Sequence, residues 1–520
     1  MKRRKSIDRR SVEVVHRVCN QKVSKIMSVS RRAVAVAAVY LGTFMATLAI
    51  SIVSVALPAI QASLETSLSG LQWVVGAYTL CLSAFMLSAG PLADRYGRKR
   101  TWLIGVAFFT LGSAICATAD SLATLIAGCA FQGLAGALVI PGALSILTQA
   151  FPDPVKRAHV IGGWSSFNAI SLILGPMMGG LLVDYAGWPS IFLVNLPLGI
   201  VALGLGLVGI EESSHPDHAA LDPVGQILSI VFLGTLTLSL INAGHSGWSA
   251  PVTTVPMVIS ALALLAFIAV EMRTARPVLP VDLLRQKAFA SANFASFVLG
   301  FSGYTSLFLF SLFLQRGQGW TATETGWRMA PVFAAMLAGS SVFGKLTRRF
   351  GMNRVMIAGY VLLGGSMLVM VSFTPSTPYG IVAPVFALLG IGLGLAVPST
   401  GAAAMGSAPR ERTGAASATM NALRQGGMTV GIALLGTIMS ARAVASLKGV
   451  LAQSGVDDVA AIAAVAVQRH EVPSTLPVAS GAFHEMLAGA FTQGFSLAAG
   501  FAGILGLAAA GVVALSSRRQ

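Results

Sequence analysis

Charged residues are scarce in this chain of 520 residues. Asp, Glu, Lys and Arg together make up 10% of the sequence, whereas hydrophobic residues make up 55%. A soluble protein needs about a quarter of its residues to be charged, so the shortage excludes large soluble domains. The mean hydropathy of +0.77 indicates an integral membrane protein instead, and the 56 glycines suit close helix packing in lipid.

The chain also lacks the patterns on which most enzymes and metal proteins depend. Its four cysteines include no CxxC pair, so neither a disulfide framework nor a zinc site is expected. HExxH, GxSxG and nucleotide-binding loop sequences are absent, and no cluster of His, Asp and Glu is suited to hold a metal. We therefore expect no enzyme activity, no cofactor, no metal and no ATP-driven pump within this chain.

Apolar runs close to membrane-spanning length recur along the whole sequence. Unpaired backbone groups are too costly in lipid for irregular structure, so each run is expected to be a helix. The predicted fold class is an all-α membrane protein with 14 transmembrane helices. The expected spans are residues 34–57, 71–92, 102–119, 122–149, 159–183, 190–210, 223–243, 252–272, 291–315, 327–347, 354–373, 380–404, 414–440 and 484–514.

Basic residues are distributed unevenly between the loops. The net charge is +16, and eleven Lys and Arg lie within residues 1–32. With a cytoplasmic N-terminus and alternating spans, 29 basic residues fall inside, five fall outside and Arg424 falls within a span. This asymmetry is what the positive-inside rule requires, so both termini are expected in the cytoplasm. No nucleic-acid motif accompanies the charge, and nucleic acid is not an expected partner.

An internal repeat relates the two ends of the sequence. GPLADRYGRKR at residues 90–100 follows the second span, and GKLTRRFGMNR at residues 344–354 follows the tenth. The copies are eight spans apart, which indicates two six-helix pseudo-repeats with two central helices inserted between them. The expected divisions are a basic cytoplasmic tail at 1–33, a six-helix bundle at 34–210, inserted helices with flanking loops at 211–290, and a second six-helix bundle at 291–515.

Four stretches give the chain a resemblance to a known family. They are the loop motif at 90–100, LIAGCAFQG at 125–133, GPMMGG at 175–180 and NALRQGG at 421–427. Together they resemble the major facilitator superfamily, and within it the group of fourteen-helix drug:proton antiporters. The resemblance covers about residues 34–515. It implies two helical bundles around a central cavity, and exchange of a drug for protons across the cytoplasmic (inner) membrane.

Two of these stretches are predicted to gate the cavity. In the loop motif, Asp94 can lie near a helix N-terminus, where a carboxylate is stabilised, and Arg95 and Arg98 can bridge to it as a latch. The alternative is a basic loop that only sets topology. The glycines and proline of the third stretch favour a seal or hinge, with ordinary small-residue packing as the alternative. The predicted gating residues are Gly90, Asp94, Arg95, Gly97, Arg98, Gly175, Pro176, Gly179 and Gly180.

The predicted substrate site centres on Arg424. This residue lies about ten positions into its span, so its side chain would have to reach roughly 15 Å to the interface. A buried arginine is costly and usually functional. Aromatic and amide side chains on the expected cavity helices suit a planar, weakly charged molecule, although such aromatics can also face lipid or a neighbouring helix. The predicted substrate-binding residues are Phe44, Phe131, Gln132, Asn168, Tyr304, Asn421, Arg424 and Gln425.

The chain departs from the resembled family where a coupling acid is expected. Ala49 stands where the resemblance implies an acidic residue in the first span, and Cys129 stands where it implies an arginine in the fourth. None of the 19 acidic residues lies near the middle of a span. This leaves Asp94 and the neighbouring His484 and Glu485 as candidates for a titrating group.

The predicted function is secondary active export of small organic molecules, such as antibiotics, drugs or toxic metabolites, coupled to protons. The alternative is an uncoupled or differently coupled permease or importer of a neutral or anionic metabolite. The expected partners are the substrate, the lipid bilayer and protons, and the sequence leaves the oligomeric state open.

Overall fold

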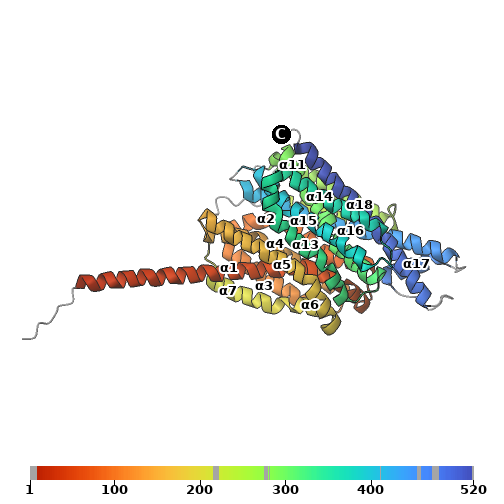
Figure 1. Cartoon of the computed structure of the whole chain (residues 1–520), viewed down its shortest axis with the longest axis horizontal. Helices are drawn as coiled ribbons and strands as arrows, with labels where there is room; N and C mark the ends of the chain where they lie inside the picture. The colour runs from red at the N-terminus through yellow and green to blue at the C-terminus, as the bar shows by residue number, and fades with distance from the viewer. Residues whose placement is uncertain are drawn as a thin grey trace, which may run out of the picture.

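Every described element of secondary structure is a helix (Figure 1). The computed structural model describes residues 9–214, 222–274, 279, 281–409, 412–453, 458–470 and 480–517, with side chains of the first helix from Arg31 onward. The first half contains α1 (Arg9–Ser63), α2 (Leu68–Tyr96), α3 (Arg98–Ala117), α4 (Leu122–Ala150), α5 (Pro154–Ala186), α6 (Ser190–Leu193) and α7 (Asn195–Gly209).

The inserted segment and the second half complete the chain. The inserted segment contains α8 (Pro223–Ser246), α9 (Pro251–Arg273) and α10 (Val281–Leu284). The second half contains α11 (Lys287–Val298), η2 (Leu299–Tyr304), α12 (Ser306–Leu312), η3 (Phe313–Gly317), α13 (Ala322–Phe350), α14 (Met352–Val369), η4 (Met370–Ser372), α15 (Tyr379–Gly406), α16 (Thr413–Gln453), α17 (Val459–Arg469) and α18 (Ser480–Ser517).

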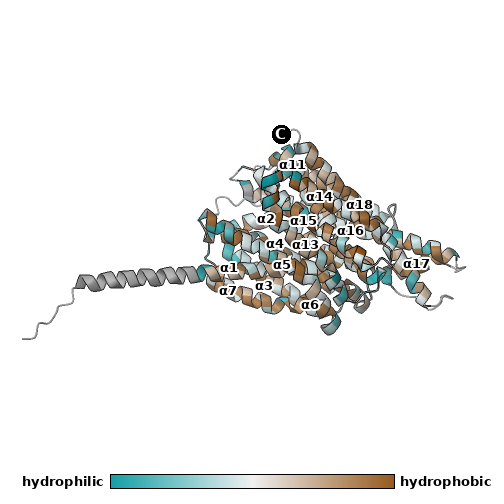
Figure 2. Ribbon diagram, viewed as in Figure 1, coloured by the Kyte–Doolittle hydropathy of each residue, from teal (hydrophilic) through white to brown (hydrophobic). Residues whose placement is uncertain are grey.

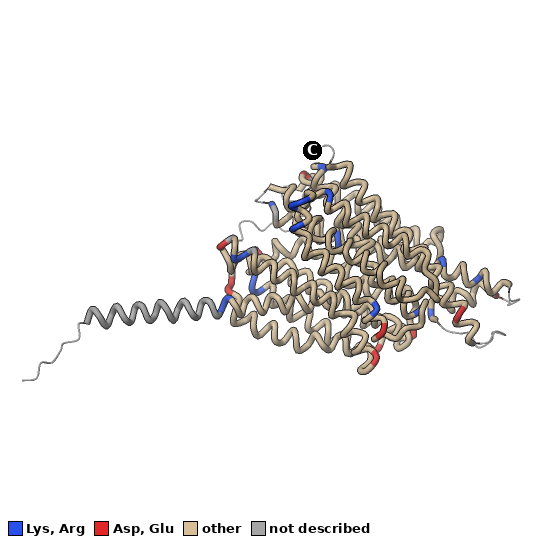
Figure 3. The backbone as a smooth tube through the Cα atoms, in the orientation of Figure 1, with Lys and Arg blue, Asp and Glu red and all other residues tan. Residues whose placement is uncertain are grey.

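Within the described residues, 14 helical segments are long and apolar enough to cross a membrane, which confirms the predicted number. Hydrophobic residues cover much of the helical body in Figure 2, and charged residues gather at its two ends in Figure 3. We call the end that holds Arg31 and the α2–α3 turn the tail side. We call the opposite end, which holds Ser63 and α17, the α17 side.

The ninth span differs from the uninterrupted helix expected at residues 291–315. It is interrupted by two π-helical segments, η2 and η3, on either side of α12. Gly300 in η2 lies so close to α16 that a Cβ atom would be 1.8 Å from the Arg424 carbonyl oxygen. A π turn changes the direction of the side chains that follow it. A regular helical period therefore cannot predict which residues of this span share a face.

The internal repeat has a structural counterpart in two tight turns. Gly97 joins α2 to α3 with φ of 105°, and Gly351 joins α13 to α14 with φ of 86°. Residues with a side chain rarely adopt these angles, whereas glycine does so readily. The aligned glycines of the two sequence copies therefore make the same kind of turn in each half.

The inserted helices pack across both halves of the molecule. α8 contacts α2 of the first half and α16 of the second half, and α9 packs on α8. The amide nitrogen of Gln226 donates to the Ala84 carbonyl at 2.9 Å, and the Thr437 hydroxyl donates to the Leu240 carbonyl at 2.8 Å. The boundaries expected between the tail, the halves and the inserted segment stay predictions.

Candidate functional site

The two halves are bonded to each other between α1 and the ninth span. The Ser311 hydroxyl donates to the Ser54 carbonyl, and the Gln315 amide donates to the Val55 carbonyl at 3.0 Å. Arg316 Nη2 lies 2.9 Å from Gln61 Oε1. These bonds lie on the α17 side, because α1 ends there at Ser63 and η3 ends there at Gly317.

The glycine-rich stretch of α5 forms a second contact between the halves. A Cβ atom on Gly180 would lie 2.4 Å from the Ala322 carbonyl oxygen, and one on Gly326 would lie 2.2 Å from that of Pro176. Only glycine permits so close a backbone approach of α5 and α13. The Asp184 carboxylate adds a 2.8 Å bond from the Thr323 amide. Gly175 and Gly179 face α1 within the first half instead, at Ser51 and Ile52.

A third contact joins α2 to α16. The Gln72 side-chain amide donates to the carbonyl oxygens of Ile432 and Ala433, at 3.1 and 3.0 Å. About one and two turns further along these helices, Thr429 bonds Thr79 at 2.9 Å. Buried polar groups satisfied across an interface make it specific as well as tight.

We call these contacts between the halves the seal. The short helix α17 lies outside the spans and covers it. The Gln61 amide donates to the Gln468 carbonyl at 2.7 Å, and the Gln468 amide donates to the Ser440 hydroxyl at 2.8 Å. α17 therefore bonds to α1 of the first half and to α16 of the second. At its end, burial lowers the pKa of His470 to about 3, with smaller contributions from the charges of Arg316 and His484.

On the tail side, the same helices expose their surfaces. In α5, Val155 is 79% exposed and Ser165 and Ser166 are also exposed. In α13, Leu337 and Val342 are 40% and 43% exposed. These two helices pack tightly against each other on the α17 side, where the glycine contacts between the halves lie.

The predicted latch is partly formed. Arg98 Nη2 lies 2.8 Å from Asp94 Oδ1, and Arg98 Nε lies 2.9 Å from the same oxygen. Arg95 is exposed and lies over the ring of Tyr96, so the expected bridge from Arg95 to Asp94 is absent here. Gly90 lies nearby with nothing within 4 Å of a Cβ position.

The carboxylate at the N-terminus of α3 belongs to Glu212 rather than to Asp94. It accepts hydrogen bonds from the backbone amides of Lys99 and Arg100, at 3.0 and 3.2 Å. A Cβ atom on Gly97 would lie only 2.7 Å from this carboxylate. A carboxylate is stabilised at this position by the helix dipole. The segment after α7 therefore fastens the turn that the sequence pattern identified.

Three partly exposed aromatic residues cluster in the first half. The ring of Phe167 lies 5.0 Å from that of Phe44 and 5.8 Å from that of Tyr40, between centroids. Asn168 follows Phe167 on α5, and its buried Oδ1 has no hydrogen-bond partner among the described residues. An unpaired buried oxygen is costly, so this position suits a ligand with a donor group.

A second cluster surrounds Arg424 in the other half. Arg424 is half-buried, Nη2 donates to the Asn421 side-chain oxygen, and the guanidinium lies 5.6 Å from the centre of the Tyr304 ring. Asn421 is itself held by a 2.9 Å bond to the Ser417 carbonyl. Gln425 is buried beside them. Predicted residues from η2 and α16 thus lie together around one fixed positive charge.

Phe131 and Gln132 do not join either cluster. Phe131 stacks on the exposed Phe108 of α3, with centroids 5.0 Å apart. Gln132 is buried and donates to the Ser113 hydroxyl at 2.6 Å. Both side chains therefore engage α3, and Gln132 also lines a small space beside Cys129.

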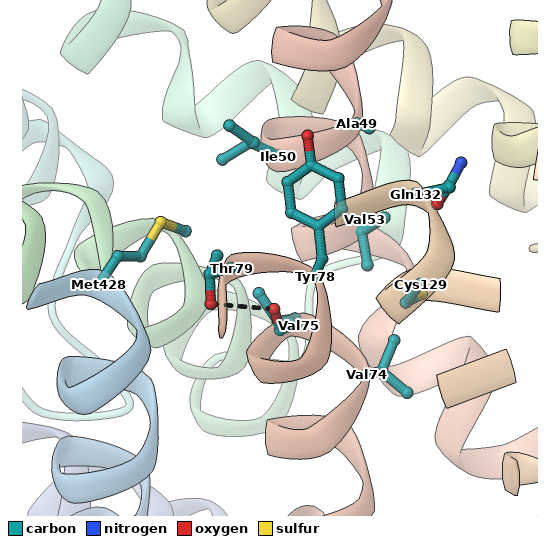
Figure 4. Close-up of a pocket in the computed structure, with 10 residues that line it drawn as sticks. All are labelled: Ala49, Ile50, Val53, Val74, Val75, Tyr78, Thr79, Cys129, Gln132 and Met428. Atoms are coloured by element: carbon teal, nitrogen blue, oxygen red, sulfur yellow. Dashed lines mark hydrogen bonds between the residues drawn. The ribbon is translucent and has the colours of Figure 1, made fainter. Parts of the chain in front are cut away.

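Ala49 and Cys129 border a small apolar space (Figure 4). Tyr78 stands within it and donates from its hydroxyl to the Ala46 carbonyl at 2.9 Å. The volume of this space is only about 10 Å³, which suffices for about one water molecule and not for a drug. No acidic side chain lines it. A tyrosine with its own partner thus stands where the resemblance implies a charge pair.

Sequence reasoning missed the residues that carry most of the seal. Gln61, Gln72, Arg316 and Gln468 are isolated polar residues at or near helix ends, and no motif singles them out. Glu212 lies more than 110 residues from the α3 amides it binds. Only the tertiary arrangement brings these partners together.

The fold and this site define a membrane transporter built from two related helical halves that meet at a seal. The family model described as Major Facilitator Superfamily matches residues 39–432. The chain belongs to this family, whose members are transporters rather than enzymes, and it is a multi-pass membrane protein.

Known proteins similar to this chain are resistance and export proteins. Multidrug resistance protein Stp of Mycobacterium tuberculosis is 38% identical over 408 residues, which cover 78% of this chain and 76% of that protein. The tetracenomycin C resistance and export protein of Streptomyces glaucescens is 32% identical over 490 residues, 93% of this chain and 91% of that protein. A bacterial homologue of the human lysosomal transporter Spinster, in an inward-facing and unoccupied conformation, has a similar fold (TM-score 0.61, 18% identity, 94% and 97% coverage).

Proposed function

We propose that this protein is a secondary active exporter of small organic molecules in the bacterial cytoplasmic membrane, working by alternating access. The observation that carries the proposal is the one-sided seal. The halves are bonded along the α17 side, whereas the tail-side faces of α5 and α13 are exposed. A transporter that alternates between two states has to close one side in each of them.

The basic residues support an assignment of sides. The tail-side ends of the spans carry most Lys and Arg of the sequence, which places this side in the cytoplasm by the positive-inside rule. The state described here is then inward-facing. An exporter takes up its substrate in this state and releases it after the α17 side opens.

The two clusters favour a neutral or anionic planar substrate. Phe44 and Phe167 offer aromatic surface, and the unpartnered oxygen of Asn168 accepts a donor group. Arg424 and Tyr304 offer a fixed positive charge and a ring. The names of the similar proteins, which mention multiple drugs and an antibiotic, agree with export of such compounds.

The coupling ion is the point at which two functions compete. Proton antiport needs a titratable group, and no acidic or histidine side chain lines the space at Ala49 and Cys129. Asp94, His484 and Glu485 are the groups proposed to carry a proton instead. The alternative is an uncoupled or differently coupled permease or importer, which the apolar lining of this space favours.

Transport into inverted membrane vesicles tests both functions. We expect neutral and anionic antibiotics to accumulate when a pH gradient is imposed, and the accumulation to vanish when the gradient is collapsed. Accumulation that ignores the gradient would favour the alternative. Strong accumulation of a dicationic dye would contradict the assignment of Arg424 to the substrate site, and no accumulation of any compound would contradict export.

A further inference from the structure

Two thiols on neighbouring helices touch inside the first half. The Sγ atoms of Cys116 on α3 and Cys129 on α4 are 3.8 Å apart. The two residues are 0% and 2% exposed. A glycine permits the contact, because a Cβ on Gly128 would lie 2.6 Å from the Cys116 sulfur. Two packed spans therefore hold the thiols in place before any ligand arrives.

The surroundings offer sulfur and neutral oxygen but no charge. The Cys116 sulfur lies 3.8 Å from Gln132 Oε1 and 3.9 Å from the Leu125 carbonyl oxygen. Among the described residues, no group of three or more His, Cys, Asp or Glu is placed to hold a metal ion. Hard cations and four-coordinate zinc need ligands that are missing here. Two soft sulfur atoms suit a thiophilic ligand that needs only two bonds.

The thiol pair also borders the space between the halves. Cys129 lines the same small space as Val74 and Val75 of α2 and Met428 of α16 (Figure 4). Because this space has room for about one water molecule, only a small apolar group attached to a sulfur-bound atom would fit among these side chains. Since Met428 belongs to the second half, such a ligand would stand where the halves meet.

We propose that Cys116 and Cys129 form a dithiol site that chelates trivalent arsenicals through both sulfur atoms. A monosubstituted arsenic(III) oxide exchanges its oxygen for the two sulfurs. Two arsenic–sulfur bonds form, the bonding between arsenic and oxygen breaks, and the two thiol protons leave with the oxygen as water. No atom changes its oxidation state. The second bond forms within one site, which makes chelation far tighter than binding to a single thiol.

Mass spectrometry of the intact protein tests the site without relying on transport. Purified transporter is incubated with methylarsine oxide, whose methyl group is small enough for this space, and an excess of glutathione, which removes arsenic held by one thiol. We expect one adduct on the wild-type protein and on the Cys81→Ser variant, which removes a lone thiol of α2. The Cys116→Ser and Cys129→Ser variants should bind at least tenfold less, and dimercaptopropanol should strip the wild-type adduct.

The result that would overturn the site is equally direct. An adduct that survives in both Cys116→Ser and Cys129→Ser, or that disappears in Cys81→Ser, would place the arsenic elsewhere. No adduct on the wild-type protein would also overturn it. Thermal unfolding of each variant, with Cys116→Ala and Cys129→Ala as second substitutions, separates a lost site from a lost fold.

Discussion

Single residues set the electrostatics of this transporter. Arg424 is the one basic residue expected well inside a span, and the structure surrounds it with the Asn421 oxygen and the Tyr304 ring. Both partners are neutral, so the positive charge is left for a ligand to balance. Ala49 and Cys129 offer no opposing charge, and Tyr78 occupies the space between them. We infer that the selectivity for substrate charge depends mainly on Arg424.

Replacing this charge tests that inference. We expect Arg424→Ala to lower the export of an anionic substrate at least tenfold, or about 1.4 kcal/mol, because the half-buried guanidinium has no substitute. Arg424→Lys should restore part of the activity, since the charge returns without the planar group that faces Tyr304. Transport rates in inverted vesicles give the measurement. Arg442→Ala removes an exposed arginine from the same helix and should have little effect.

A second prediction at this scale concerns the α2–α3 turn. Gly97→Ala should lower the stability of the protein by about 1–3 kcal/mol, because a side chain is strained at φ of 105° and meets the Glu212 carboxylate. Thermal unfolding in detergent measures the change. Gly90→Ala is the matched control, since nothing lies within 4 Å of its Cβ position. Equal stability of both variants would show that Glu212 and the turn adapt without cost.

At the scale of helices, the seal consists of backbones that come unusually close. Gly180 and Gly326 let α5 and α13 meet across the two halves, whereas Gly175 and Gly179 bind α5 to α1 within one half. One stretch of α5 therefore presents two glycine faces to two different partners. The α1 face is expected to persist when the α13 face separates during transport.

A larger residue at the inter-half face should prevent closure. We expect Gly180→Leu to abolish transport while the protein still inserts, because the side chain would collide with the Ala322 backbone. Gly162→Leu places the same side chain on the same helix where nothing lies within 4 Å, and it should remain active. Transport and membrane yield are measured together. Normal transport by Gly180→Leu would show that the α5–α13 contact is not part of the gate.

We expect the helix α17 to make closure dependent on pH. In the closed state the pKa of His470 is about 3, whereas an exposed histidine has a pKa of about 6.5. The closed state thus binds fewer protons than an open one. Closure should be unaffected by pH above about 6.5 and should weaken as the pH on the α17 side falls below it.

Accessibility of a buried residue measures this effect. A cysteine at Ser311, which is fully buried in the seal, should react faster with an impermeant maleimide as the external pH falls. His470→Gln should remove most of the dependence. The groups that act on His470 are Arg316 and His484, and its ring packs on Phe491. A rate that stays constant from pH 7.5 to about 5 in the otherwise wild-type protein would contradict the prediction.

At the scale of the whole molecule, the charge distribution orients the protein in the membrane. The α17 side is expected outside the cell and the tail side in the cytoplasm. The loop between the last two spans is expected outside. Residue 454, a position in this loop suited to surface labelling, lies outside the described residues. Part of that loop, residues 459–469, forms α17.

Cysteine labelling tests this orientation with two exposed positions. Ser376→Cys on the α17 side should react with an impermeant maleimide in intact cells, and Lys345→Cys on the tail side should react only after permeabilisation. Both variants are made in a background without the native cysteines. The reverse pattern would show that the α17 side faces the cytoplasm, and the proposed direction of transport would then be reversed.

Much of the fold could be predicted from the sequence, but some features were less predictable than others. The spans and the turn glycines Gly97 and Gly351 were predictable, because lipid forces helices and a left-handed turn favours glycine. Phe131 was placed with the cavity although it stacks on Phe108. Its helix is apolar on all sides, so no hydrophobic period distinguishes a cavity face from a packed one.

The sequence by itself determined the class of protein, the number of spans and the repeat, because each depends on composition and local pattern. It also showed that the usual charges are missing at Ala49 and Cys129. Tertiary structure alone decided where the two halves bond to each other, that Glu212 rather than Asp94 binds the α3 amides, and that Gln61 bonds Gln468 of α17. These contacts join residues far apart in the chain, and their geometry arises only when helices with similar apolar surfaces select their neighbours by close packing.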